Sequence, residues 1–223
     1  MPACLGERPN CLPWGDARIL RVAASPASLF VGITGASGAP YALRLVEQLA
    51  LRGCSISLCL SDAGLEVVRY ELDLREQARD TITEAFLKRA GAAATVYLPA
   101  DMAATVSSGS AFPEAAVICP CSMSTAAHIA LGTSTTLIHR AGAVALKERR
   151  PLVLVPREMP LSTVHLRRLL EASEAGAIIV PPMPAFYNRP STLQDAIDFV
   201  VGKVLAVLGF AHDFYPAWGR DRT

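Results

Sequence analysis

The sequence predicts one doubly wound α/β domain, in which a parallel sheet carries helices on both faces. Three observations support this fold class. Apolar runs of strand length alternate with segments of helical periodicity along most of the chain. The first strand, turn, helix and second strand form a βαβ unit, which favours a parallel sheet. No internal repeat and no linker interrupts the alternation, so a single domain is expected.

The first βαβ unit occupies residues 29–60. The apolar run 29–34 predicts a buried strand, and it leads into a turn of small residues that ends at Pro40. Proline is tolerated in the first turn of a helix. Apolar residues at helical spacing then continue the predicted helix to Gly53, which ends it. Residues 54–60 form the second predicted strand.

The remaining elements continue this alternation to the end of the domain. Each predicted strand is short, apolar and bounded by Gly, Pro or charge, and the last helix has the clearest helical period. Further strands are predicted at 95–98, 115–119, 151–155 and 177–180, and further helices at 63–71, 75–90, beyond Pro120, 140–148, 163–174 and 191–208.

Composition excludes several classes of protein. The 21 basic and 20 acidic residues give a net charge of +1, which argues against a basic surface for nucleic acid. Half of the residues are apolar and the mean hydropathy is positive. No continuous apolar run approaches the ~18 residues of a membrane-spanning helix. The surplus apolar surface therefore predicts a deeply buried sheet, a subunit of an oligomer, or both.

The six cysteines predict neither a disulfide scaffold nor a metal site. They form no CxxC pair, and no histidine lies at zinc-ligand spacing from a cysteine pair. They are expected to be reduced thiols of a cytoplasmic protein. Residues 1–27 are predicted to form a flexible leader, and they lack a signal-peptide pattern. The predicted domain covers residues 28–218, and residues 219–223 form a short tail.

Small and hydroxyl residues follow three of the predicted strands, where ligands bind in this fold class. Hydroxyls and helix N-terminal N–H groups suit a phosphate, and arginine adds a two-pronged donor. The first turn is neither the GxGxxG fingerprint nor a P-loop, so a mononucleotide such as FMN is predicted. The alternative is that Gly35 and Gly38 only form a tight turn. The strand-end residues are Gly35, Ala36, Ser37, Ser61, Ser122, Met123, Ser124, Thr125 and Arg157.

Four stretches resemble the UbiX/Pad-type flavin prenyltransferases over about residues 29–218. They are VGITGASGAPYA at 31–42, VICPCS at 117–122, ALKERRPLVLVPRE at 145–158 and PAFY at 184–187. The resemblance implies a flavodoxin-like or Rossmann-like subunit assembled as a dodecamer. It implies transfer of a dimethylallyl group from dimethylallyl monophosphate to N5 and C6 of reduced FMN without a metal. The product, prenylated FMN, would serve UbiD-type decarboxylases.

The same resemblance implies roles for individual residues. The strand-end residues, from Gly35 to Arg157, would hold FMN. Ser37 and Glu71 would move protons as the new ring closes. Lys203 stands where the family usually has arginine, so it keeps the charge but loses the two-pronged geometry. The prenyl phosphate would be surrounded by Arg140, Lys147, Glu158, Tyr187 and Lys203.

Three positions depart from the family pattern. Thr136 replaces an asparagine, Ala143 an aspartate, and Met102 an aromatic residue that could stack on the flavin or an allyl cation. They motivate a second hypothesis, in which the chain is a carrier of FMN or prenylated FMN, or a homologue without turnover. A flavin-dependent cysteine decarboxylase ranks lower, because its first-helix histidine and its PASANT stretch are absent.

Several of these residues also have simpler interpretations. Without the resemblance, Glu71 would be an exposed acid at a helix end, and Tyr187 a loop tyrosine with a packed ring. His165 begins a predicted helix and would be a capping or packing residue. Cys119 and Cys121 flank one proline, which is poor geometry for a disulfide and favours structural thiols.

Overall fold

The computed structural model describes residues 25–215 of the 223-residue chain. Its six strands form one parallel sheet in the order β3-β2-β1-β4-β5-β6, so the chain winds outward in both directions from the β1–β4 pair. This confirms the doubly wound fold. The strands are β1 Ser28–Ile33, β2 Ser55–Leu60, β3 Thr95–Tyr97, β4 Ala115–Cys121, β5 Leu152–Pro156 and β6 Ile178–Ile179.

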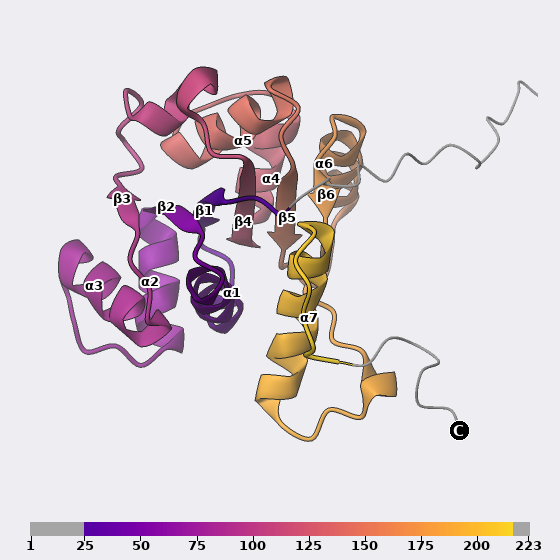
Figure 1. Cartoon of the computed structure of the whole chain (residues 1–223). Coiled ribbons are helices and arrows are strands. Elements are labelled where there is room, and N and C mark those ends of the chain that lie inside the picture. The colour runs from indigo at the N-terminus through magenta and orange to yellow at the C-terminus, as the bar shows by residue number, and fades with distance from the viewer. Residues whose placement is uncertain (1–24, 216–223) are drawn as a thin grey trace, which may run out of the picture.

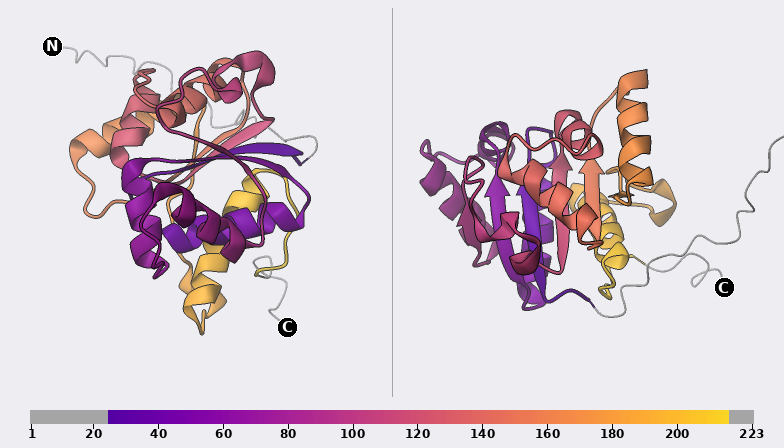
Figure 2. Two further views of the ribbon diagram at one scale, coloured as in Figure 1. Left: turned by 90° about the vertical axis from the view of Figure 1, so that its left-hand side faces the viewer. Right: turned by 90° about the horizontal axis from the view of Figure 1, so that it is seen from above.

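The helices cover the two faces of the sheet in two layers (Figures 1 and 2). Strand side chains alternate between these layers, as the two-residue period of a strand requires. Leu29 and Val31 face a core built with α1, α2, α3 and α7, whereas Phe30 faces a core built with α4 and α5. The helices are α1 Ala39–Leu51, α2 Asp62–Glu71, α3 Arg79–Ala90, α4 Met123–Ala130, α5 Leu137–Lys147, α6 Thr163–Glu174 and α7 Leu193–Val207.

Several predicted boundaries were wrong by a few residues, and hydrogen bonds explain two of them. Helix α5 starts three residues before the predicted 140, because the Thr136 hydroxyl caps it by accepting from the His139 amide. Helix α3 starts at Arg79 rather than at 75. There the Arg79 side chain donates to the Leu60 carbonyl at the end of β2, at 3.0 Å. Strand β4 runs two residues beyond the predicted end, through the cis Cys119–Pro120 bond.

The structure tests the predicted domain limits only in part. Most of the predicted leader and the whole predicted tail lie outside the described residues. Ala27, the last residue of that leader, is bonded to the sheet, because its carbonyl accepts from the Ser55 amide at 2.8 Å. The limits of 28 and 218 stay predictions.

The structure describes four of the six cysteines and the helices formed by the apolar segments. The four cysteines within residues 25–215 are all unpaired. Burial raises the pKa of the Cys119 thiol to about 12 and also raises that of Cys121, so both stay protonated and unreactive. No helix in the described part of the chain is long and apolar enough to cross a membrane.

Helix α6 is the least covered helix of the fold. Only Ala172 among its twelve residues is buried, and α6 stands away from the sheet in Figure 2. Val164, Leu166 and Leu170 expose 61, 54 and 58% of their surface. Ser162 and His165 form a capping box at its start, which confirms the capping role predicted for His165.

Two histidines join helices α4 and α5. The rings of His128 and His139 stack with centroids 4.2 Å apart and planes 6° from parallel. His139 is buried, and its Nδ1 lies 3.0 Å from the Thr135 hydroxyl. Burial, and secondarily the neighbouring His128, lower the pKa of His139 to about 4, so the fold favours its neutral form.

This stack predicts acid sensitivity. Below pH 6.5 the unfolded chain protonates His139, whereas the folded chain resists protonation down to about pH 4. The free energy of unfolding should therefore fall by about 1 kcal/mol per pH unit across that window from this group alone. Urea unfolding at several pH values should show a shallower fall for His139→Gln. An equal slope in wild type and variant would contradict the assignment.

Candidate functional site

A pocket lies beyond the carboxyl ends of the central strands, beside the point where the strand order reverses. Its volume is about 290 Å³. The carboxyl edge at this reversal is where doubly wound sheets bind ligands. The pocket is lined by Ser37, Gly38, Tyr41, Arg157, Glu158, Met159, Pro181, Pro182 and Met183.

The first turn of the sequence motif is built by close backbone approaches. The Thr34 hydroxyl donates to the Pro120 carbonyl at 2.9 Å and accepts from the Ser122 amide at 2.7 Å, which ties the ends of β1 and β4 together. A Cβ on Gly35 would lie 2.5 Å from the Ala63 Cβ, and Gly38 has a φ of 134°. Both glycines are therefore required by the fold, and the turn they allow places Ser37 in the pocket.

Glu71 is a fixed part of this turn. It is the last residue of α2 and is partly buried, and its Oε2 accepts from the Gly38 amide at 2.9 Å and the Ala39 amide at 2.8 Å. The simpler interpretation as an exposed acid was wrong. A carboxylate at a helix N-terminus is favoured by the helix dipole. These two amides at the start of α1 are thus already paired and are not open to a phosphate.

Glu71→Ala should destabilise the fold by about 1–3 kcal/mol, because it leaves two amides of a partly buried helix end without their charged acceptor. Urea denaturation midpoints measure the change. Glu66→Ala is the matched control, since Glu66 is on the same helix but makes only a surface pair with Arg69. That control should cost less than about 1 kcal/mol. Equal losses in both variants would show that the Glu71 contacts contribute little.

The other strand-end hydroxyls cap helices. The Ser61 hydroxyl accepts from the Gly64 amide at 2.9 Å at the start of α2, and the Ser122 hydroxyl accepts from the Thr125 amide at 3.2 Å at the start of α4. This caps the first turn of α4, which contains the predicted FMN residues Met123, Ser124 and Thr125. A hydroxyl residue after a strand therefore caps the following helix, and this capping role exists beside the predicted role in binding.

Arg157 and Tyr41 supply donors at the pocket wall. The Arg157 amide donates to the Cys121 carbonyl at 3.2 Å, which holds the end of β5 against β4, while its side chain is exposed. Burial raises the pKa of the Tyr41 phenol, and Cys119 and Glu71 add to this effect. Tyr41 is thus a protonated donor at neutral pH. Sequence reasoning missed Tyr41, although its place three residues after Gly38, in the first turn of α1, was a usable signal.

Two predicted prenyl-phosphate residues lie on α5, around a loop that precedes β4. Arg140 Nε donates to the Ser107 carbonyl at 3.2 Å. Lys147 is paired with Glu148, and its ammonium holds the pKa of that carboxyl below its usual range. A Cβ on Gly109 would lie 2.9 Å from Lys147 Nζ, so the glycine lets the loop approach this pair closely. The two cations therefore border one loop, 107–109.

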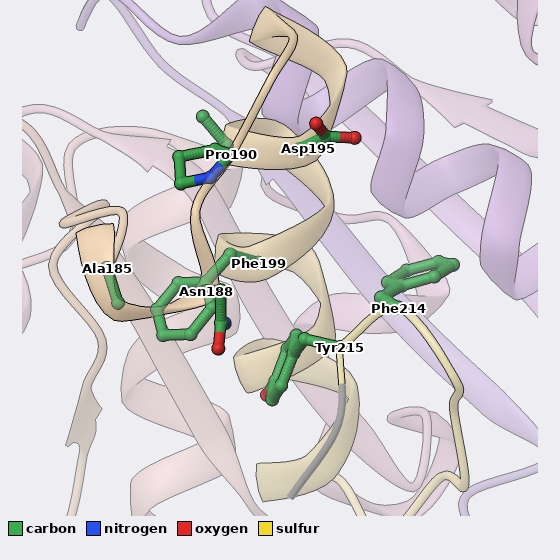
Figure 3. A pocket seen from close by; sticks show the side chains of 8 residues that line it. Ala185, Asn188, Pro190, Asp195, Phe199, Phe214 and Tyr215 are labelled. Carbon is green, nitrogen blue, oxygen red and sulfur yellow. The ribbon is translucent and has the colours of Figure 1, made fainter. Parts of the chain in front are cut away.

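Two further predicted residues meet on the other face of the sheet. Tyr187, in a 3-10 helix at Phe186–Asn188, packs edge-on against Phe199 of α7 at 6.0 Å between ring centroids. Lys203 Nζ lies 5.5 Å from the centroid of the same Phe199 ring. A second pocket, of about 220 Å³, lies here between Asn188, Phe199 and Tyr215 (Figure 3). The Asn188 amide nitrogen is buried without a partner among the described residues.

The predicted phosphate clamp is therefore only partly assembled within one chain. Tyr187 and Lys203 converge on Phe199, but Lys147 does not join them. Helix α5 packs on one face of the sheet and α7 on the other, so the sheet separates the two sets of cations. Ser37, Arg157 and Glu158 form a third group in the strand-end pocket.

The departures from the family pattern are mild where the structure describes them. Thr136 caps α5 with its hydroxyl, a role that asparagine also fills. Ala143 is partly buried on the same helix, and Met102 is exposed in the loop after β3. None of the three disrupts its element.

The chain is similar to known flavoproteins in both sequence and structure. The Flavoprotein family model matches residues 20–205. The flavin prenyltransferase UbiX of Pseudomonas aeruginosa is 44% identical over 200 residues, covering 88% of this chain and 96% of that protein. AnUbiX (PadA1), solved in complex with FMN and dimethylallyl pyrophosphate, has a TM-score of 0.76 at 36% identity, covering 86% of this chain and 97% of that one. The dodecameric FMN-dependent Ubix-like decarboxylase from Escherichia coli O157:H7 has a TM-score of 0.73 at 41% identity, covering 86% and 98%.

The doubly wound sheet with its strand-end pocket and the match to the Flavoprotein family model together identify a flavoprotein-type enzyme. By both sequence and structure, the chain belongs to the UbiX-type flavin prenyltransferases of the Flavoprotein family. This confirms the resemblance seen in the sequence motifs and the predicted class of enzyme, a prenyltransferase that acts on flavin.

Proposed function

We propose that this enzyme transfers a dimethylallyl group from dimethylallyl monophosphate to N5 and C6 of reduced FMN, which makes prenylated FMN. The observation that carries the proposal is the strand-end pocket, which joins Ser37, Arg157 and Glu158 in a chain related to flavin prenyltransferases over most of its length. Reduced FMN supplies the two nucleophilic ring positions.

The residues of the pocket fit FMN by their donor chemistry. The Arg157 guanidinium and the capped first turn of α4 suit a phosphate, and the Ser37 hydroxyl and Tyr41 phenol suit carbonyl or hydroxyl oxygens. Pro181, Pro182 and Met183 form an apolar wall, which would keep water from an allyl cation. Ser37 and Glu158 both line this pocket, and one of them would accept and pass on the proton that leaves C6.

Cations then stabilise the leaving phosphate. Arg140, Lys147 and Lys203 would balance its growing charge as the C–O bond breaks, and the Tyr187 phenol would donate to it. Glu71 contributes by holding the turn that presents Ser37, in addition to the proton movement that the family resemblance implies. The unpartnered Asn188 amide is a further donor, because a buried polar group without a partner is costly until a ligand pairs it.

We further propose that one active site is shared between subunits. A second copy of the chain is the simplest way to unite cations that one chain holds on opposite faces of its sheet. The exposed apolar residues of α6 supply contact surface, and the related E. coli protein is a dodecamer. We propose the same assembly for this chain.

The deciding experiment for the activity is anaerobic incubation of the enzyme with reduced FMN and the donor, followed by mass measurement of the flavin. The expected flavin is heavier by one five-carbon unit. Monophosphate and diphosphate donors should be tested in parallel, because AnUbiX was solved with the diphosphate. Bound flavin of unchanged mass with either donor would favour the carrier hypothesis instead.

Subunit complementation tests the shared site. Lys147→Ala and Lys203→Met chains are each expected to be impaired. When they are co-expressed and assembled together, about one quarter of the sites should regain both cations if these come from different subunits. Activity of the mixed assembly equal to the mean of the two variants would place both cations in one subunit and contradict the proposal, as would a stable monomer by light scattering.

Two wider predictions accompany this function. The product would pass to a UbiD-type decarboxylase, as the family resemblance implies. The cytoplasmic location rests on the unpaired cysteines and stays a prediction.

A further inference from the structure

Lys203 is held by aromatic rings. Its Nζ lies 5.5 Å from the centroid of the Phe199 ring and 5.4 Å from that of the Tyr215 ring. The two ring centroids are only 4.8 Å apart at an angle of 42°, so the rings form a contacting pair on one side of the ammonium. No acidic side chain within residues 25–215 forms a salt bridge with Lys203.

The fold brings Tyr215 to this position by a specific close approach. The segment 208–215 turns back along α7, and a Cβ on Gly202 would lie only 2.6 Å from Tyr215 Cε1. Helix α1 and its C-cap residue Arg52 fix the segment at two points. Arg52 donates to the Ala211 carbonyl at 3.0 Å, and the Arg44 guanidinium lies 4.8 Å from the centroid of the Phe214 ring. The ring of Tyr215 is therefore anchored beside α7 (Figure 3).

A pair of aromatic rings beside a lysine has a different consequence from an ion pair. A carboxylate would neutralise the ammonium and compete with an incoming anion. Aromatic faces attract the cation without removing its charge, and its N–H groups remain able to donate to an anion. Contact with the two rings also restricts the flexible lysine side chain before a ligand binds, which reduces the entropy lost on binding.

We propose that Tyr215, together with Phe199, is a positioning residue that orders the Lys203 ammonium for the phosphate of the prenyl donor. The inference rests on the proposed function for the identity of the anion. It would account for a lysine at the position where the family pattern has arginine, because the two rings supply the order that an arginine side chain has through its rigid planar head. Tyr187, which packs on the same Phe199 ring, would lie beside this cation.

Donor binding to the enzyme loaded with oxidised FMN tests the positioning role, because no transfer takes place in that state. Tyr215→Leu should weaken dimethylallyl monophosphate about two- to five-fold, the scale of one lost cation–π contact. Tyr215→Phe keeps the ring and should rescue the affinity. Phe214→Leu is the matched control, since it removes the adjacent ring, which contacts Arg44 instead. FMN affinity should stay constant throughout.

A double-variant cycle separates positioning from general structural damage. In a Lys203→Met background, Tyr215→Leu should produce no further loss of donor affinity. A loss as large as in the wild-type background would overturn the inference while leaving the proposed function intact. Absence of donor binding by the wild-type enzyme would instead count against the proposed function.

A measurement without any donor tests the contact with the two rings itself. Lysines labelled by reductive ¹³C-methylation keep their charge, and a lysine beside two aromatic rings should give a ring-shifted methyl resonance. Lys203→Arg identifies the Lys203 signal by its disappearance. That signal should move toward the position of the other lysines in Tyr215→Leu, where only the Phe199 ring remains, but not in Phe214→Leu. A Lys203 signal that already lies with the exposed lysines in the wild type would overturn the inference.

Discussion

Lys147→Ala should lower the rate of prenyl transfer on the order of 100-fold while the enzyme still binds FMN, the usual cost of losing one group that stabilises charge in a transition state. Lys147 is the last residue of α5. It borders the 107–109 loop and does not line the strand-end pocket. Its charge matters most as the C–O bond of the donor breaks, so it should affect rate more than FMN affinity.

Stopped-flow flavin absorbance at saturating donor measures this rate. Lys88→Ala, which removes an exposed lysine from α3, is the matched control and should leave the rate unchanged. Lys147→Arg keeps a positive charge and tests whether charge alone suffices. A wild-type rate in Lys147→Ala would remove Lys147 from the mechanism and would favour the carrier hypothesis.

Arg157→Ala should weaken FMN binding by about 1.5–3 kcal/mol, which is the range for a hydrogen bond to a charged group and corresponds to roughly 10- to 100-fold in affinity. The side chain follows β5, is exposed and lines the pocket, so its removal takes away a donor without leaving a buried group unpaired. The variant keeps the link between β4 and β5, because the Arg157 backbone amide, and not its side chain, donates to the Cys121 carbonyl.

Fluorescence titration of FMN measures this affinity. Arg157→Lys should fall between wild type and Arg157→Ala, since lysine retains the charge but not the two-pronged geometry. Arg75→Ala, at an exposed position between α2 and α3, controls for the loss of one positive charge. FMN affinity unchanged in Arg157→Ala would show that the phosphate is bound elsewhere.

Local sequence determined much of this protein. The alternation of apolar strands and amphipathic helices is a property of neighbouring residues, and it was enough to predict the parallel sheet and its two helical layers. The strand-end positions of Ser37 and Arg157 followed from the same order, because all strands of a parallel sheet end at one edge. Boundaries depended on caps such as Thr136, which a side-chain hydrogen bond sets.

Only the tertiary structure decided how the charged residues are grouped. Glu71 reaches the amides of Gly38 and Ala39 across more than thirty residues of sequence, and no periodicity connects them. Lys147 and Lys203 belong to one predicted clamp, yet they lie in helices on opposite faces of the sheet. Tyr215 meets Lys203 only because Gly202 leaves room for its ring. Such contacts depend on how elements pack in three dimensions, and periodicity along the chain carries no information about that packing.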